Sequence, residues 1–192
     1  MIYRTLHTTL YSYEGPVSSC LTEVRLTPRP MADRQEIRHF RLRVLPEPET
    51  IDKRVDYYGN EVWTFSVMEP HDRLTVTAVS TVEVTPRQPV AMELSPAWED
   101  VLASLRGAAT AETLEAGEFR WESPYVPFLP ELAEYARRSF APGRPVLEAA
   151  HDLTGRIYRD FKYSPRSTSI ETPLAEVMKK RRGVCQDFAH VM

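Results

Sequence analysis

The sequence is most informative over residues 183–190, which read Gly183-Val184-Cys185-Gln186-Asp187-Phe188-Ala189-His190. Two arginines precede this stretch, as cations often do at the C-terminal end of a helix, and Gly183 is predicted to occupy the C′ position after it. Apolar residues then recur at 184, 188, 191 and 192, which predicts a second helix that begins near Cys185. At a helix start, free backbone N–H groups stabilise a thiolate, the form that attacks carbonyl carbon, and can also stabilise an oxyanion. On residue types alone, Cys185 is either such a thiol or a small apolar residue in a core helix.

The chain upstream of this stretch, from about residue 95, has helical periodicity. A helix is predicted near 97–105, and Pro130 is placed at the first position of another, over 131–140. Thr172-Pro173 is predicted to be the N-cap and first residue of a short helix that ends before Gly183. The longest predicted helix, over 146–161, rests on one apolar stripe: Val146, Ala150, Leu153, Ile157 and Phe161.

The first 90 residues have the period of two that is typical of half-buried strands. Apolar residues alternate with polar ones over 40–44 and again over 74–84. Between them, 57–63 is predicted to be a hairpin in which Gly59 supplies a positive φ. The sequence therefore predicts an α+β protein, with a β-sandwich-like domain over 1–90 and a mainly helical region over 95–192.

Composition excludes several functional classes. The 24 basic and 27 acidic residues give a net charge of −3, which disfavours nucleic acid as a partner. Only 7 glycines occur and no phosphate-binding glycine motif is present, so nucleotide chemistry is not expected. Two cysteines are too few for a disulfide framework or a thiolate zinc site, and we expect no cofactor or metal. Without a signal-like or membrane-spanning apolar run, we expect a cytoplasmic protein with no membrane partner.

The cysteine stretch closely resembles the nucleophile motif of bacterial transglutaminase-like proteins, in the papain-like superfamily. The residues before it match too: Phe161-x-Tyr163 after a helix, then Thr172-Pro173-Leu174. The N-terminal half resembles the β-rich domain that precedes this core in many bacterial members. The matching strings there are Glu23-Val24-Arg25-Leu26-Thr27-Pro28, Gln35 and Asp56-x-x-Gly59-Asn60. The resemblance implies that 95–192 is the helical front half of a transglutaminase-like core.

This resemblance implies a Cys-His-Asp triad in which Cys185 attacks an amide or peptide carbonyl and forms a thioester. In the family, the histidine and aspartate follow the cysteine by some tens of residues, so both are expected beyond Met192. His190 lies about 140° around the helix from Cys185, and we expect it to serve packing or hydrogen bonding. The implied function is a cysteine protease or amide acyltransferase, and the 192-residue chain alone is expected to be inactive.

Two further residues are candidates for lining the substrate cleft. Gln186 directly follows the nucleophile and is the first candidate. The alternative interpretation is that Gln186 and the acidic Asp187, in the first turn of the helix, serve helix capping. Tyr163 could present its hydroxyl beside the thiol, or be a buried tyrosine that anchors its loop. A different class also stays open, namely a non-catalytic scaffold or protein-binding module that retains the fold. The sequence does not specify the substrate beyond a peptide or protein amide, nor the oligomeric state.

Overall fold

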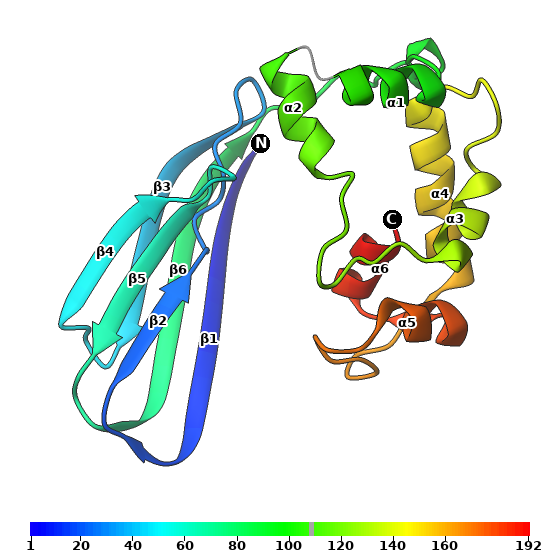
Figure 1. Cartoon of the computed structure of the whole chain (residues 1–192). Helices are drawn as coiled ribbons and strands as arrows, with labels where there is room; N and C mark the ends of the chain where they lie inside the picture. The colour runs from blue at the N-terminus through cyan, green and yellow to red at the C-terminus, as the bar shows by residue number, and fades with distance from the viewer. Residues whose placement is uncertain (108–109) are drawn as a thin grey trace. The chain divides into compact units, whose positions relative to one another are not determined.

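The computed structural model describes residues 1–107 and 110–192, which form two compact units, Met1–Pro89 (unit 1) and Val90–Met192 (unit 2). Unit 1, described throughout, contains six strands, joined in the sheet orders β1-β6-β3 and β2-β5-β4 with antiparallel pairing (Figure 1). Their bounds are β1 Ile2–Val17, β2 Cys20–Val24, β3 Gln35–Leu45, β4 Thr50–Val55, β5 Glu61–Val67 and β6 His71–Val84.

The two sheets of unit 1 pack face to face. Every second residue of β6 from Leu74 to Val82 is buried, as the alternation predicts. These side chains meet residues of the other sheet, of which Phe65 and Val67 on β5 are fully buried. Core residues from both sheets thus confirm the predicted β-sandwich. The predicted hairpin is also present, because β4 and β5 are joined by a turn in which Gly59 has φ +79°.

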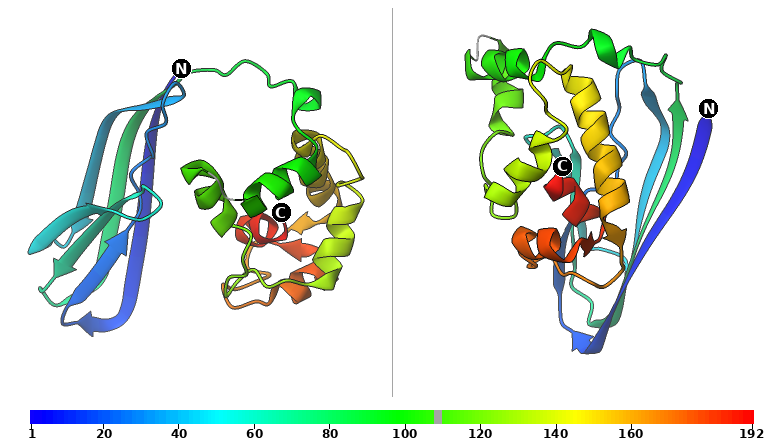
Figure 2. Two further views of the ribbon diagram at one scale, coloured as in Figure 1. Left: turned by 45° about the horizontal axis from the view of Figure 1, so that its top comes forward. Right: turned by 90° about the vertical axis from the view of Figure 1, so that its right-hand side faces the viewer.

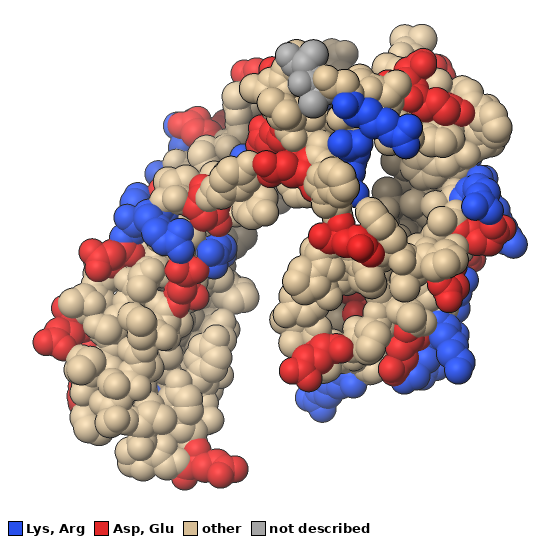
Figure 3. Space-filling view, viewed as in Figure 1, with Lys and Arg blue, Asp and Glu red and all other residues tan. Residues whose placement is uncertain are grey.

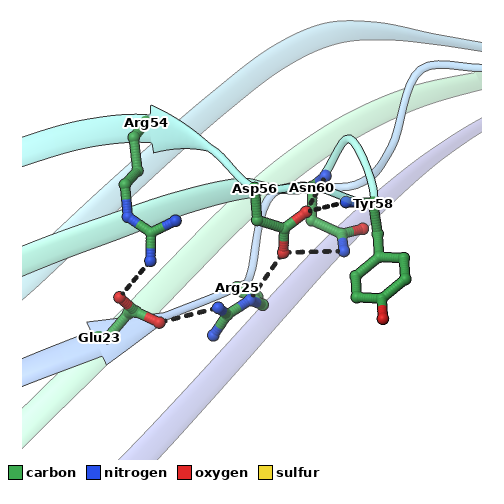
Figure 4. Close-up of polar contacts among 6 residues, drawn as sticks. All are labelled: Glu23, Arg25, Arg54, Asp56, Tyr58 and Asn60. Atoms are coloured by element: carbon green, nitrogen blue, oxygen red, sulfur yellow. Dashed lines mark hydrogen bonds and ion pairs between the residues drawn. The ribbon is translucent and has the colours of Figure 1, made fainter.

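Two of the strings shared with the β-rich family domain, those that begin at Glu23 and at Asp56, meet in one polar cluster (Figure 4). The Asp56 carboxylate accepts the backbone N–H of Asn60 at 2.9 Å and the Arg25 guanidinium at 3.1 Å. Glu23 bridges Arg25 at 2.8 Å and Arg54 at 2.7 Å. Led by the Asn60 N–H, these donors lower the pKa of Asp56 to about 2. The cluster joins the end of β2 to the β4–β5 turn.

Opposite charges are interspersed across the face seen in Figure 3, where red and blue patches lie next to one another on both units. In unit 1 this reflects paired side chains, such as Lys53 and Glu61 with Nζ and Oε1 3.0 Å apart.

Unit 2 is mainly helical in its described residues. Its elements are η1 Met92–Leu94, α1 Trp98–Gly107, α2 Ala111–Glu118, α3 Pro130–Arg137, α4 Val146–Asp160, β7 Lys162–Tyr163, α5 Leu174–Lys180, β8 Arg182–Gly183 and α6 Cys185–Val191. Pro130 begins α3, as predicted. None of the described helices combines the length and apolar composition needed to cross a membrane.

The core of unit 2 forms around α4. Leu153, Ile157 and Phe161 from the predicted stripe are buried, which confirms the C-terminal part of that interpretation. Val146 and Ala150 are only partly buried, and Ala149 is buried in place of Ala150. The buried residues of the stripe pack with residues of α5 and with Val191 of α6, so that α6 lies beside α4 (Figure 2). The α6 helix, which begins at Cys185, is therefore held against this apolar core through Val191 and Phe188.

Both predicted boundaries of α5 are wrong in detail. Its N-cap is Pro173 rather than Thr172, whose hydroxyl instead accepts the Ser169 N–H at 2.8 Å. At the other end, the left-handed residue is Arg181, with φ 49°, and not Gly183. The Arg181 guanidinium lies 4.7 Å from the ring centroid of Phe161, and such stacking offsets the unfavourable backbone of a non-glycine residue.

Candidate functional site around Cys185

The segment that leads into Cys185 is paired with the segment that follows α4. Strands β7 and β8 run parallel, with Tyr163 in register with Gly183. The Ser164 N–H donates to the Gly183 carbonyl at 2.9 Å, which extends this pairing by one residue. The pairing places Tyr163 beside Gly183, which lies 20 residues later in the sequence. Gly183 is the last residue of β8 and lies two residues before Cys185.

Gly183 is required by the close approach of Asp187. The Asp187 side chain is only 6% exposed, and its Oδ2 accepts the Val184 N–H at 2.7 Å and the Thr168 hydroxyl at 2.6 Å. A Cβ on Gly183 would lie 2.6 Å from that same oxygen. Asp187 therefore caps α6, as the alternative interpretation of this turn predicted. Gly183 is needed because it leaves room for the Asp187 carboxylate, and not because its φ is positive.

Cys185 is exposed, so its interpretation as a small core residue is wrong. Gln186 beside it is exposed as well. Tyr163 is 60% exposed, which excludes the buried anchor proposed as its alternative. Roles for Gln186 and Tyr163 in lining a cleft stay predictions. Cys20, in contrast, is half-buried and packs against the core of unit 1.

The histidines do not complete a catalytic site within the part of the chain that the structure describes. His190 stacks on Tyr125, with ring centroids 6.2 Å apart and planes 13° apart, so it packs as expected. In residues 1–107 and 110–192, no hydrogen bond joins the Cys185 thiol to a histidine, and no three His, Cys, Asp or Glu side chains are grouped to hold a metal ion.

Sequence reasoning missed Thr168, the second partner of Asp187. The only available signal was the number of hydroxyl residues over 164–172, which is typical of a loop with internal turns. Nothing in that pattern indicates which hydroxyl reaches a helix 19 residues further along the chain. The contact is long-range, and such contacts are set by the packing of unit 2.

Comparison with known proteins identifies the N-terminal region. Residues 3–83 match the family described as the bacterial transglutaminase-like N-terminal region. An uncharacterized protein of Mycobacterium tuberculosis is 39% identical over 192 residues, which cover 98% of this chain and 59% of the relative. An uncharacterized protein of Mycobacterium leprae is 29% identical, over 98% of this chain and 63% of the relative. The chain thus spans about three fifths of the length of these relatives.

The fold of the chain is that of a solved structure. The crystal structure of a "Putative Cysteine Protease" from Cytophaga hutchinsonii matches with a TM-score of 0.63 and 18% identity, over 100% of this chain and 63% of that one. The protein is therefore α+β with a β-rich N-terminal region, as predicted. More specifically, residues 3–83 match the bacterial transglutaminase-like N-terminal region, which supports the resemblance seen in the sequence.

Proposed function

We propose that this chain belongs to a transglutaminase-like cysteine enzyme in which Cys185 is the nucleophile and a peptide or protein amide is the substrate. The observation that carries the proposal is the exposed thiol at the first residue of α6, because a core cysteine could not reach a substrate. The transglutaminase-like N-terminal region and the fold shared with a "Putative Cysteine Protease" support the same chemistry.

The proposed reaction has two steps. The Cys185 thiolate attacks the amide carbonyl carbon, the C–N bond breaks, and the departing amine takes up a proton as the thioester forms. An amine or water then attacks the thioester carbonyl, the C–S bond breaks, and the thiol is restored. Attack by water gives a carboxylic acid, by deamidation or peptide cleavage, and attack by an amine gives a new amide.

The proton transfers require one group that first accepts the thiol proton and then donates a proton to the leaving amine. The resemblance assigns both steps to a histidine beyond Met192, which an aspartate orients. We therefore expect the 192-residue chain alone to be inactive. General acid–base help is worth about 10²–10⁴-fold, and triad members act as a unit, so a thiol without its partners retains little activity. We also propose a cytoplasmic location, the ordinary compartment for a chain whose two cysteines are both free.

The test compares the full-length protein, its Cys185→Ala variant and a matched Cys20→Ala variant on a glutamine-containing peptide. Ammonia release, amine incorporation and backbone cleavage are measured separately, which distinguishes deamidase, acyltransferase and peptidase activity. We expect turnover that Cys185→Ala abolishes and Cys20→Ala preserves. Inactivity of the folded full-length protein on a broad amide panel would refute the enzyme proposal and favour a non-catalytic scaffold. Turnover by the 192-residue chain that requires Cys185 would show that the base lies within it.

A further inference from the structure

The loop between β7 and α5, residues 164–173, is attached to the start of α6 at two points. At its beginning, the Ser164 N–H donates to the Gly183 carbonyl. At its middle, the Thr168 hydroxyl donates to Asp187 Oδ2 at 2.6 Å. Each attachment reaches a residue two positions from Cys185 in sequence. The loop is therefore a direct neighbour of the segment that carries the thiol.

The bond between Asp187 and the Val184 N–H at the start of α6 is the acidic half of a capping box. The other half is absent, because the N-cap residue is Val184, whose side chain cannot accept a hydrogen bond. The N3 residue Asp187 accepts the N–H of Val184 itself and lies beneath a glycine that leaves room for it. A serine or aspartate at 184 would bind N–H groups further into the first turn and would not replace the bond to the Val184 N–H. The arrangement found here also binds the loop, through Thr168.

We infer that Asp187 is a positioning residue for Cys185, which it serves by holding the Thr168 loop and the first turn of α6 to one carboxylate oxygen. The inference rests on the proposed function, since it assigns a role at the same thiol. Hydrogen bonds to a buried carboxylate are stronger than neutral ones, and a shared acceptor couples its donors. Loss of the Thr168 hydroxyl should therefore loosen the backbone around Cys185 as well as the loop.

The test uses Thr168→Val, which keeps the shape of the side chain and removes the hydroxyl, and Thr168→Ser, which keeps the hydroxyl. Thr110→Val is the matched control, because the Thr110 hydroxyl caps α2 in the same unit, where it accepts the Thr113 N–H at 3.2 Å. The rate of Cys185 alkylation by iodoacetamide is measured in the 192-residue chain, with Cys20 as the internal reference. Amide hydrogen exchange at Val184 is measured in parallel.

In Thr168→Val we expect Val184 exchange to accelerate about tenfold and Cys185 alkylation to slow about three- to tenfold, because the oriented N–H groups of the first turn favour the thiolate. Thr168→Ser should restore both values, and Thr110→Val should change neither. If Thr168→Val does not fold, Thr168→Ala, which also removes the hydroxyl and leaves the Asp187 charge in place, should show the same slowing.

Equal effects in Thr168→Val and Thr110→Val, or equal losses in Thr168→Val and Thr168→Ser, would overturn the inference. Thr168-dependent alkylation of Cys185 in a protein that turns over no amide would support the positioning role and refute the proposed function. Cys185-dependent turnover in the full-length protein, together with a normal alkylation rate in Thr168→Val, would support the proposed function and refute the positioning role. The two proposals therefore fail by different results.

Discussion

Replacement of Gly183 by alanine should destabilise unit 2, because the new methyl group would occupy space that Asp187 already fills. The added Cβ would lie 2.6 Å from Asp187 Oδ2 and 2.9 Å from Asp187 Cβ. Both separations are too short for non-bonded atoms, so one group must move. Rotation of the carboxylate would break its bonds to Val184 and Thr168, and a shift of the backbone would disturb β8. Overpacking of this kind costs about 1–3 kcal/mol, and we expect Gly183→Ala to lower the free energy of unfolding by that amount.

A double-mutant cycle with Asp187→Gly tests the cause. Asp187→Gly removes every atom that the new Cβ would meet at these distances. In that background Gly183→Ala should be neutral or should stabilise by up to about 1 kcal/mol, because alanine restricts the unfolded chain and Gly183 has no positive φ. The coupling free energy should therefore be about 1–3 kcal/mol. Urea unfolding followed by tryptophan fluorescence in a Trp63→Phe background reports unit 2, which contains the other two tryptophans.

The same cost of Gly183→Ala in both backgrounds would refute this explanation, since the clash with Asp187 would then not be its cause. A neutral Gly183→Ala in the native background would refute it as well. Either result would leave the glycine to be explained by backbone conformation, as the sequence first indicated.

Three other changes have defined outcomes. Gly155→Ala in α4 should stabilise unit 2 by about 0.5–1 kcal/mol in urea unfolding, because it raises helix propensity and its new Cβ meets only the flexible end of Arg159, 3.2 Å away. The pKa of Asp56 is lowered to about 2 in the folded state, so the stability that its carboxylate contributes is complete above pH 4 and is lost as the pH falls towards 2. Asp56→Asn should be less stable at neutral pH, and its stability should change less over that pH range, in an acid titration followed by circular dichroism. Iodoacetamide at near-neutral pH should label exposed Cys185 faster than half-buried Cys20, as peptide mass spectrometry would show, and equal labelling would contradict this.

Elements with a strong local pattern could be predicted from the sequence. The alternation over 74–84 requires a half-buried strand, and the stripe that ends at Phe161 requires a helix with one buried face, so burial in the structure follows both patterns. Gly59 was interpreted correctly because a tight hairpin turn has few alternatives. In each case the determining contacts are periodic, or lie within a few residues.

The sequence did not predict conformations and contacts that depend on a partner distant in sequence. Arg181 adopts the left-handed conformation that glycine usually takes, and its guanidinium stacks on Tyr135 and Phe161, which lie 46 and 20 residues earlier. Thr168 gives no local signal of its bond to Asp187. The partners proposed for Cys185 belong to the same group, because a triad is assembled from residues far apart in sequence.

Gly183 shows how a correct motif can carry the wrong physical reason. After two arginines, a glycine satisfies the rules for a helix C′ position, yet the left-handed turn falls two residues earlier, at Arg181. Once that turn is complete, the chain runs extended through β8, where any residue could satisfy the backbone. Only the carboxylate of Asp187, lying where a Cβ would be, excludes a side chain there. Gly183 and Asp187 therefore depend on each other, because the carboxylate fits only where residue 183 has no side chain. A substitution at either residue should alter the backbone that precedes Cys185.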